Sequence, residues 1–241
     1  MRKDNLFKKR KNNIMNFDFG AKTTAVFDDM LIRSVPLYNE LQHMIGEITS
    51  EFAQDKTNIY DVGCSTGTTL ITIDKIVKKN VSLVGIDYSR AMLDKCRERF
   101  KKEGIKNKIE LVCGDLNDGI NIHNASVVIL NLTLQFVRPL YRDSIIRNIY
   151  AGLNEKGCLI LVEKVLGDDS TFNSMFIKFY YEMKKRNGYT ETEIAHKREA
   201  LENVLIPYRL DENKQLLKRN GFLCQDIFYK WYNFCGIVAI K

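Results

Sequence analysis

The side chains best suited to chemistry surround a glycine-rich turn that follows an apolar segment. The turn reads Asp61-Val62-Gly63-Cys64-Ser65-Thr66-Gly67, and a second apolar segment ends at Asp87, 20 residues beyond Gly67. Glycines in such a turn let the backbone approach a nucleoside closely, and a carboxylate at the end of the next strand accepts hydrogen bonds from ribose hydroxyls. This spacing predicts a site for a nucleotide-like ligand.

The position of Asp61 favours S-adenosylmethionine over a dinucleotide. Gly63 and Gly67 are four residues apart, unlike the G-x-G-x-x-G spacing, and Asp61 precedes the first glycine by two residues. A pyrophosphate on the following helix N-terminus would be repelled by a buried acid so close to it. S-adenosylmethionine carries an ammonium group and no phosphate, so the same acid would favour its binding.

Two further polar residues follow predicted strands. Asp115 comes directly after Gly114, where a carboxylate and a backbone N–H could bind an adenine edge, and Asn131 lies near the end of a later apolar run. Each has an ordinary alternative role, Asp115 as a turn residue and Asn131 as a strand-end cap. The carboxyl ends of parallel strands meet at one edge of a sheet, so we expect these residues to line the same crevice as the glycine turn.

The turn also matches a hydrolase nucleophile elbow, because residues 63–67 fit G-x-S-x-G. A serine hydrolase needs a histidine partner, and only His123 and His196 follow the turn. His123 stands in a polar stretch and His196 in a charged helical segment. We therefore expect no catalytic triad.

The elements that position these residues alternate between strands and helices. The predicted strands span residues 60–62, 81–87, 109–112, 126–132 and 158–163. The predicted helices span residues 24–49 with a break at Pro36, then 68–78, 89–102 and 142–153. This alternation predicts a doubly wound α/β sheet with parallel strands. The alternation is interrupted at about residues 166–210, which we expect to form a helical insertion. After the insertion we expect a helix at 212–219 and a β-hairpin over 228–240.

The net charge of +7 is concentrated at the N-terminus. Residues 1–11 contribute +5 of it, which leaves +2 for the other 230 residues. We therefore expect residues 1–15 to be a flexible, solvated basic tail rather than an RNA contact, and residues 16–241 to be the ligand-binding domain. A nearly neutral domain requires no nucleic acid as a partner.

Six cysteines and three histidines are scattered singly, with no C-x-x-C pair. This spacing favours free thiols in a reducing cytoplasm over disulfides or a zinc site. No apolar run reaches the roughly 18 residues of a membrane span, and no apolar segment follows the basic N-terminus as in a secretory signal. We expect a cytoplasmic protein that uses no metal and enters no membrane.

These motifs together resemble the carboxy-S-adenosyl-L-methionine synthase family, part of the class I methyltransferase-fold superfamily. The resemblance covers about residues 24–241. Its most specific blocks are Ile32-Arg33-Ser34-Val35-Pro36-Leu37-Tyr38, Leu130-Asn131-Leu132-Thr133-Leu134-Gln135-Phe136, Arg186-Asn187-Gly188-Tyr189, Lys197-Arg198 and Tyr232-Asn233-Phe234. It implies a Rossmann-like α/β fold with a mostly parallel seven-stranded sheet, a C-terminal antiparallel hairpin and the helical insertion.

The resemblance also implies a reaction. S-adenosylmethionine and prephenate would give carboxy-S-adenosylmethionine and phenylpyruvate, the former being a carboxymethyl donor for tRNA wobble-uridine modification. The alternative is a methyltransferase acting on a small molecule or tRNA, since methyltransferases share the glycine turn and its acids. The residues implied to contact the ligand are Tyr38, Gly63, Cys64, Ser65, Asp87, Tyr88, Asp115, Leu116, Asn131 and Arg198.

Two points stay open within the resemblance. Tyr88 stands where the family has Asn, which would exchange a polar contact for stacking. The residues that bind the carboxylates of prephenate are not implied by any motif, and Arg33 and Tyr189 are candidates.

Helical spacing singles out Arg198 independently. In a helix predicted over residues 191–204, Arg198 lies four residues after Ile194 and three before Leu201, on the apolar stripe. A guanidinium that faces inward needs an anionic partner. That partner is either Glu202, four residues on, or a ligand carboxylate, which arginine binds bidentately. We assign Arg198 as the catalytic residue that holds the transferred carboxylate, from its own subunit or a partner's.

The insertion also contains apolar residues at helical spacing. They are Phe172, Met175, Phe176, Phe179, Tyr180 and Met183. Such a face packs in a core or between subunits, so we expect a homodimer.

Overall fold

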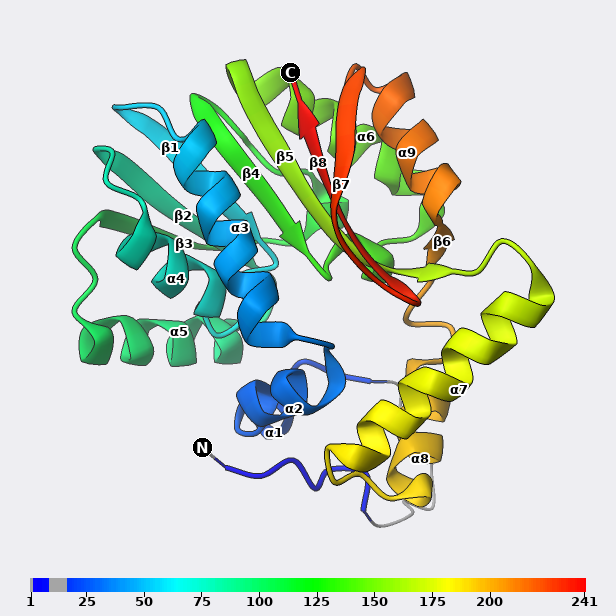
Figure 1. The fold of residues 1–241 in the computed structure, drawn as a ribbon. Coiled ribbons are helices and arrows are strands. Elements are labelled where there is room, and N and C mark those ends of the chain that lie inside the picture. The colour runs from blue at the N-terminus through cyan, green and yellow to red at the C-terminus, as the bar shows by residue number, and fades with distance from the viewer. Residues whose placement is uncertain (1, 9–16) are drawn as a thin grey trace.

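The computed structural model describes residues 2–8 and 17–241, and its centre is a mixed β-sheet with helices on both faces (Figure 1). The strand order is β3-β2-β1-β4-β5-β8-β7, and a short strand, β6, pairs with β5 beside this path. The strands are β1 Thr57–Val62, β2 Val81–Asp87, β3 Lys108–Cys113, β4 Ala125–Asn131, β5 Leu153–Leu166, β6 Tyr208–Arg209, β7 Cys224–Trp231 and β8 Phe234–Ile240.

The sheet confirms the predicted topology. Strands β1 to β5 run parallel, and β8 is antiparallel to both of its neighbours, β5 and β7. Neighbouring residues of β4 are buried on opposite faces: Val127 and Ile129 pack in one core cluster, and Val128 and Leu130 in the other. A strand that is covered on both faces needs apolar residues at consecutive positions, and for this reason β4 could be predicted from its sequence.

The helices form three groups (Figure 1). Helices α3 (Tyr38–Phe52), α4 (Thr68–Ile76) and α5 (Arg90–Glu103) cover one face, and α6 (Pro139–Gly152) and α9 (Leu210–Arg219) cover the other. The remaining helices form a layer across the carboxyl ends of the strands, which we call the helical cap; they are α1 Ala21–Thr24, α2 Phe27–Ser34, α7 Ser170–Arg186 and α8 Glu191–Leu201. Two 3₁₀ turns, η1 Leu116–Asp118 and η2 Leu134–Phe136, follow β3 and β4.

Side-chain caps explain where some of the helices begin. Ser89 caps α5 by accepting a hydrogen bond from the Met92 N–H at 3.3 Å. Thr190 and Glu193 form a reciprocal capping box at the start of α8. The end of α8 differs from the prediction, because the helix stops at Leu201 and the chain turns extended at Glu202.

The start of the chain is packed where a solvated tail was expected. Asp4 is 1% exposed; its carboxylate accepts a hydrogen bond from the Tyr189 hydroxyl at 2.6 Å, and its N–H donates to Asp29 at 2.7 Å. The Phe7 carbonyl lies 2.9 Å from Nδ1 of His196 in α8. Residues 2–8 therefore belong to the helical cap, whereas residues 1 and 9–15 of the expected tail lie outside the described residues.

Candidate active site

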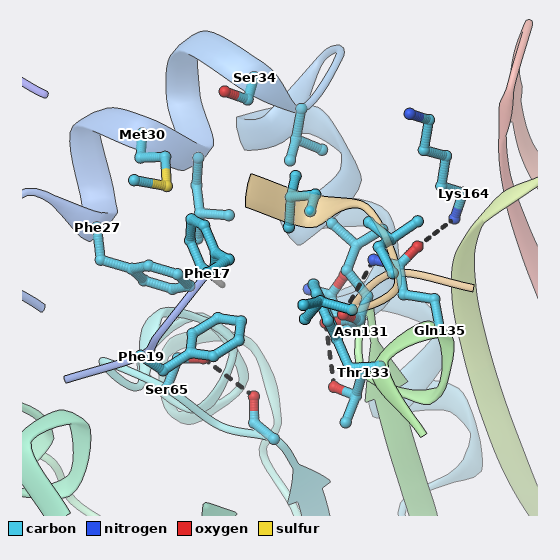
Figure 2. A pocket seen from close by; sticks show the side chains of 18 of the residues that line it. Phe17, Phe19, Phe27, Met30, Ser34, Ser65, Asn131, Thr133, Gln135 and Lys164 are labelled. Atoms are coloured by element: carbon cyan, nitrogen blue, oxygen red, sulfur yellow. Dashed lines mark hydrogen bonds between the residues drawn. The ribbon is translucent and has the colours of Figure 1, made fainter. Parts of the chain in front are cut away.

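One cavity of about 880 Å³ lies between the carboxyl edge of the sheet and the helical cap (Figure 2). The structure brings every residue implied by the resemblance to its wall. Those residues are Tyr38, Gly63, Cys64, Ser65, Asp87, Tyr88, Asp115, Leu116, Asn131 and Arg198. They come from six separate stretches of chain, so their convergence is a product of the fold.

The glycine turn after β1 has the left-handed backbone that its sequence predicts. Gly63 and Gly67 have φ of +83° and +80°, and a Cβ at Gly63 would collide with the side chain of Thr133. The N–H groups of Gly63 and Cys64 donate to the Ile86 carbonyl at 2.7 and 3.0 Å. The turn is thereby fastened to the end of β2 and leaves backbone facing the cavity.

Asp87 is held in one orientation at the end of β2. Its Oδ2 accepts from the Ser65 N–H at 2.9 Å, and its Oδ1 accepts from the Ser89 N–H at 2.8 Å. Burial raises the pKa of Asp87, while these two N–H groups oppose that rise. An oriented carboxylate beside a glycine turn is the arrangement that accepts ribose hydroxyls.

Asp61 also lines the cavity, although the resemblance did not include it among the residues that contact the ligand. Its position two residues before Gly63 had already indicated a role in binding an ammonium group. It is 1% exposed, and neither carboxylate oxygen has a hydrogen-bond partner among the described residues. Burial, and then the charge of Asp87, raise the pKa of Asp61 to about 7. A buried acid without a partner fits an ammonium-bearing ligand such as S-adenosylmethionine.

Asp115 and Asn131 both line the cavity and also make local hydrogen bonds. One oxygen of Asp115 accepts from the Asn117 N–H at 2.9 Å, so the residue caps η1 while lining the cavity. Asn131 donates from Nδ2 to Thr69 at 3.4 Å, and its buried Oδ1 has no partner in the described chain. Each residue thus keeps a polar atom for a ligand.

Aromatic rings close one side of the cavity (Figure 2). Phe19 makes edge-on contacts with Phe27, Tyr88 and Phe136 at centroid distances of 6.2, 6.1 and 5.3 Å. Tyr88 is half-exposed, and partial burial raises its pKa to about 12. This wall offers apolar and stacking surface to a nucleoside, and Phe19 had no motif that could have identified it.

Arg198 lines the cavity, but not in the way that helical spacing predicted. Its side chain is exposed, and the buried positions of α8 are Glu193, Ile194, Lys197 and Ala200. No ion pair joins Arg198 to Glu202 in the described chain, because Glu202 lies beyond the helix end. The buried face of α8 is therefore centred on Lys197 instead of Arg198, a rotation of about 100° around the helix axis. Arg198 lies at the edge of this buried face.

Arg33 and Tyr189, the candidates for binding prephenate, instead make contacts within the helical cap. The Arg33 guanidinium donates to the carbonyls of Asn187 and Asp4 at 2.8 and 3.1 Å and to the Asp29 carboxylate at 3.2 Å. It also lies 3.8 Å from the centroid of the Tyr189 ring, whose hydroxyl is bonded to Asp4. Neither side chain lines the cavity.

Three lysines in the cavity wall had not been identified from the sequence: Lys164, Lys184 and Lys197. Lys197 stood in a block that supported the resemblance, whereas Lys184 is one of three consecutive cations in the last turn of α7. No local signal distinguishes a buried lysine from an exposed one.

The hydrolase alternative finds no support. Ser65 Oγ contacts the Gly63 carbonyl at 3.3 Å, while His123 precedes β4 at the opposite edge of the sheet and His196 bonds to Phe7. Within residues 2–8 and 17–241, no three His, Cys, Asp or Glu side chains are grouped as metal ligands. No helix of this same part of the chain has the length and apolar character of a membrane span.

Comparison with known proteins identifies the family. Residues 59–157 match the methyltransferase domain family. The chain is 55% identical over 242 residues to a carboxy-S-adenosyl-L-methionine synthase of Methylococcus capsulatus, with 100% of both chains covered. It is 43% identical over 242 residues to the synthase of Desulforapulum autotrophicum, covering 100% of this chain and 98% of the relative.

The solved structures support the fold. An O-methyltransferase family protein from Burkholderia thailandensis superposes with a TM-score of 0.66 at 13% identity, over 95% of this chain and 65% of that one. A likeness at such low identity concerns the fold alone. Full-length identity to the sequence relatives is the stronger finding, and it shows that this chain belongs to the carboxy-S-adenosyl-L-methionine synthase family.

Proposed function

We propose that this protein converts S-adenosylmethionine and prephenate to carboxy-S-adenosylmethionine and phenylpyruvate. The observation that carries the proposal is full-length identity of 55% to a relative named for the first product. The cavity supports it, because acids and a glycine turn form one side and cationic side chains line another. Its product would be the carboxymethyl donor for an enzyme that modifies the wobble uridine of tRNA.

The acidic side suits the cationic substrate. Asp61 would neutralise the ammonium group of S-adenosylmethionine, and Asp87 would accept its ribose hydroxyls. The aromatic wall and Tyr38 would hold the adenosyl group and exclude water. Desolvation and positioning are what this reaction requires, because a free carbon dioxide must be captured before it escapes.

The proposed reaction balances without a protein nucleophile. The bond from the prephenate ring to its carboxylate breaks, its electron pair makes the ring aromatic, and the ring hydroxyl leaves as hydroxide. The S-methyl carbon loses a proton and forms the new bond to the released carbon dioxide. Proton and hydroxide combine as water, so no oxidant or reductant is needed.

Arg198 is proposed to hold the new carboxylate, as its guanidinium is exposed at the cavity wall without an ion-pair partner in the described chain. We also propose that the protein is a cytoplasmic homodimer.

The reaction is tested by incubating the purified protein with S-adenosylmethionine and prephenate and weighing the products by mass spectrometry. We expect an adduct heavier than S-adenosylmethionine by one carbon dioxide, together with phenylpyruvate, formed only when both substrates are present. Arg198→Lys should lower the yield about tenfold or more, because lysine lacks the bidentate fork. Recovery of S-adenosylhomocysteine and a methylated acceptor instead would favour the methyltransferase alternative.

A further inference from the structure

Three lysines from three elements reach the part of the cavity that lies away from the glycine turn. Lys164 lies near the end of β5, Lys184 near the end of α7 and Lys197 within α8. All three line the cavity, and in Figure 2 Lys164 lies across it from Ser65. Lys184 is 4% exposed and Lys197 6%, while Lys164 is half-buried.

These ammonium groups lack carboxylate partners. Within the described chain, none of the three forms an ion pair within 4.0 Å, although Lys197 Nζ donates to the Ser34 hydroxyl at 3.2 Å. Lys164 Nζ instead lies 4.8 Å from the centroid of the Tyr180 ring, and Lys184 Nζ lies 5.2 Å from that of Tyr189. Aromatic faces attract a cation but do not neutralise it.

The nearby charges are predominantly positive. Asp4 acts on Lys184 and Lys197, yet its carboxylate is already bonded to the Tyr189 hydroxyl, and the Arg33 guanidinium adds a fourth cation. The other acids that line the cavity are those around the glycine turn, together with Glu199 and Glu202 near Arg198. Arg33 is already paired with the Asp29 carboxylate, so among the described residues Asp4 is left to offset the charge of the lysines.

Burial of an uncompensated charge is unfavourable, and it lowers the pKa of each of the three lysines. Desolvation, followed by repulsion from Lys197 and Lys164, lowers the pKa of Lys184 to about 7. Desolvation likewise lowers the pKa of Lys164 and of Lys197 to about 8. A bound polyanion would restore these groups to their charged form, so the cluster is poised for an anionic ligand.

We propose that Lys164, Lys184 and Lys197 form a subsite that binds the carboxylates of a dicarboxylate co-substrate beside the sulfonium site. The inference rests on the proposed function and extends it, since prephenate is the dicarboxylate in question. A sulfonium or ammonium group would be repelled there. The cationic S-adenosylmethionine is thereby directed to the acids and the dianion to the lysines of one shared cavity.

The test uses Lys184→Met and Lys197→Met, which keep side-chain length and remove charge. We expect the KM for prephenate to rise about tenfold or more in each, because a charge-assisted bond to carboxylate is lost. Binding of S-adenosylhomocysteine should change less than about twofold. Lys184→Arg should restore part of the prephenate affinity, and Lys178→Met, an exposed lysine of α7 outside the main cavity, should behave as wild type.

Calorimetry of prephenate binding to the S-adenosylhomocysteine complex provides a readout that needs no turnover. Unchanged prephenate affinity in both methionine variants would overturn the subsite, even if the wild-type protein forms the carboxylated product. Weakened S-adenosylhomocysteine binding with normal prephenate binding would also overturn it, because the lysines would then hold the amino-acid carboxylate. A wild-type protein that binds prephenate through these lysines yet makes no product would refute the proposed function alone.

Discussion

At the scale of single residues, the cavity concentrates buried charges that the described side chains leave uncompensated. Asp61 has two buried oxygens without partners, and Lys184 and Lys197 have no carboxylate in contact among the described residues. Such groups destabilise a fold unless a ligand completes them. Their persistence on opposite sides of one cavity is the physical basis for assigning it two oppositely charged substrates.

The burial of Asp61 should make the free energy of unfolding depend on pH. Its pKa in the folded protein is about 7, above the ordinary 3.8, so the folded state retains a proton that the unfolded chain has released between these values. Stability contributed by this group therefore falls as the pH rises from about 4 to 7, and the penalty is complete above that window. Asp61→Asn should raise the free energy of unfolding by about 2–4 kcal/mol at pH 8 and far less at pH 4.

The measurement is urea unfolding at both pH values, with the exposed Asp118→Asn as the control. The same Asp61 variant should bind S-adenosylmethionine at least about tenfold more weakly, since the ammonium group loses its counter-charge. Equal stabilisation at pH 4 and pH 8 would show that Asp61 is not the titrating group.

At the scale of elements, the N-terminal segment is a structural part of the cap. Asp4 links Tyr189, which follows α7, to the start of the chain, and its carbonyl accepts from Arg33 of α2. The segment thus fastens two elements that carry cavity residues. It also supplies the negative charge that partly offsets the lysine cluster.

Removing this anchor should loosen the cap. Asp4→Ala leaves the buried Tyr189 hydroxyl without its acceptor, so we expect a loss of about 1–3 kcal/mol in the free energy of unfolding. Faster amide hydrogen exchange in α7 and α8 than in β4 should accompany it. Lys3→Ala, an exposed neighbour, should change stability by less than about 0.5 kcal/mol; identical behaviour of the two variants would contradict the anchoring role.

At the scale of the whole molecule, α7 presents apolar surface that residues 2–8 and 17–241 leave exposed. Phe172 and Met175 are exposed, whereas Phe179, farther along the helix, packs against Tyr232 at a centroid distance of 5.0 Å. The apolar face predicted from spacing is thus divided into an outer part and a part packed on the β7–β8 hairpin. Such an outer apolar face is suited to contact with a second copy.

The proposed homodimer can be examined by light scattering over a range of concentrations. We expect a dimer for the wild-type protein and a shift to monomer for Phe172→Asp, because a charge is buried at the contact. Leu140→Asp, at an exposed apolar residue of α6, is the matched control and should remain dimeric. A wild-type protein that is monomeric at every concentration would refute the prediction.

Features that depend on neighbours in sequence were predictable from the sequence. The β4 strand followed from its apolar run, the cap of α5 from Ser89, and the glycine turn from Gly63 and Gly67. The strand ends then placed Asp87 and Asn131 at the cavity, because parallel strands present their carboxyl ends at one edge. These conclusions need only side-chain periodicity and local backbone conformation.

Features that depend on distant contacts were not predictable in this way. The elements packed around α8 bury Lys197 and leave the neighbouring Arg198 exposed. The Asp4–Tyr189 bond joins residues 185 positions apart. Patterns along the chain were therefore sufficient to predict the sheet, the turn and the ligand class of the acidic side. Which cations meet in the cavity depends on the packing of distant elements, because the burial of a charge is set by the elements around it and not by its neighbours along the chain.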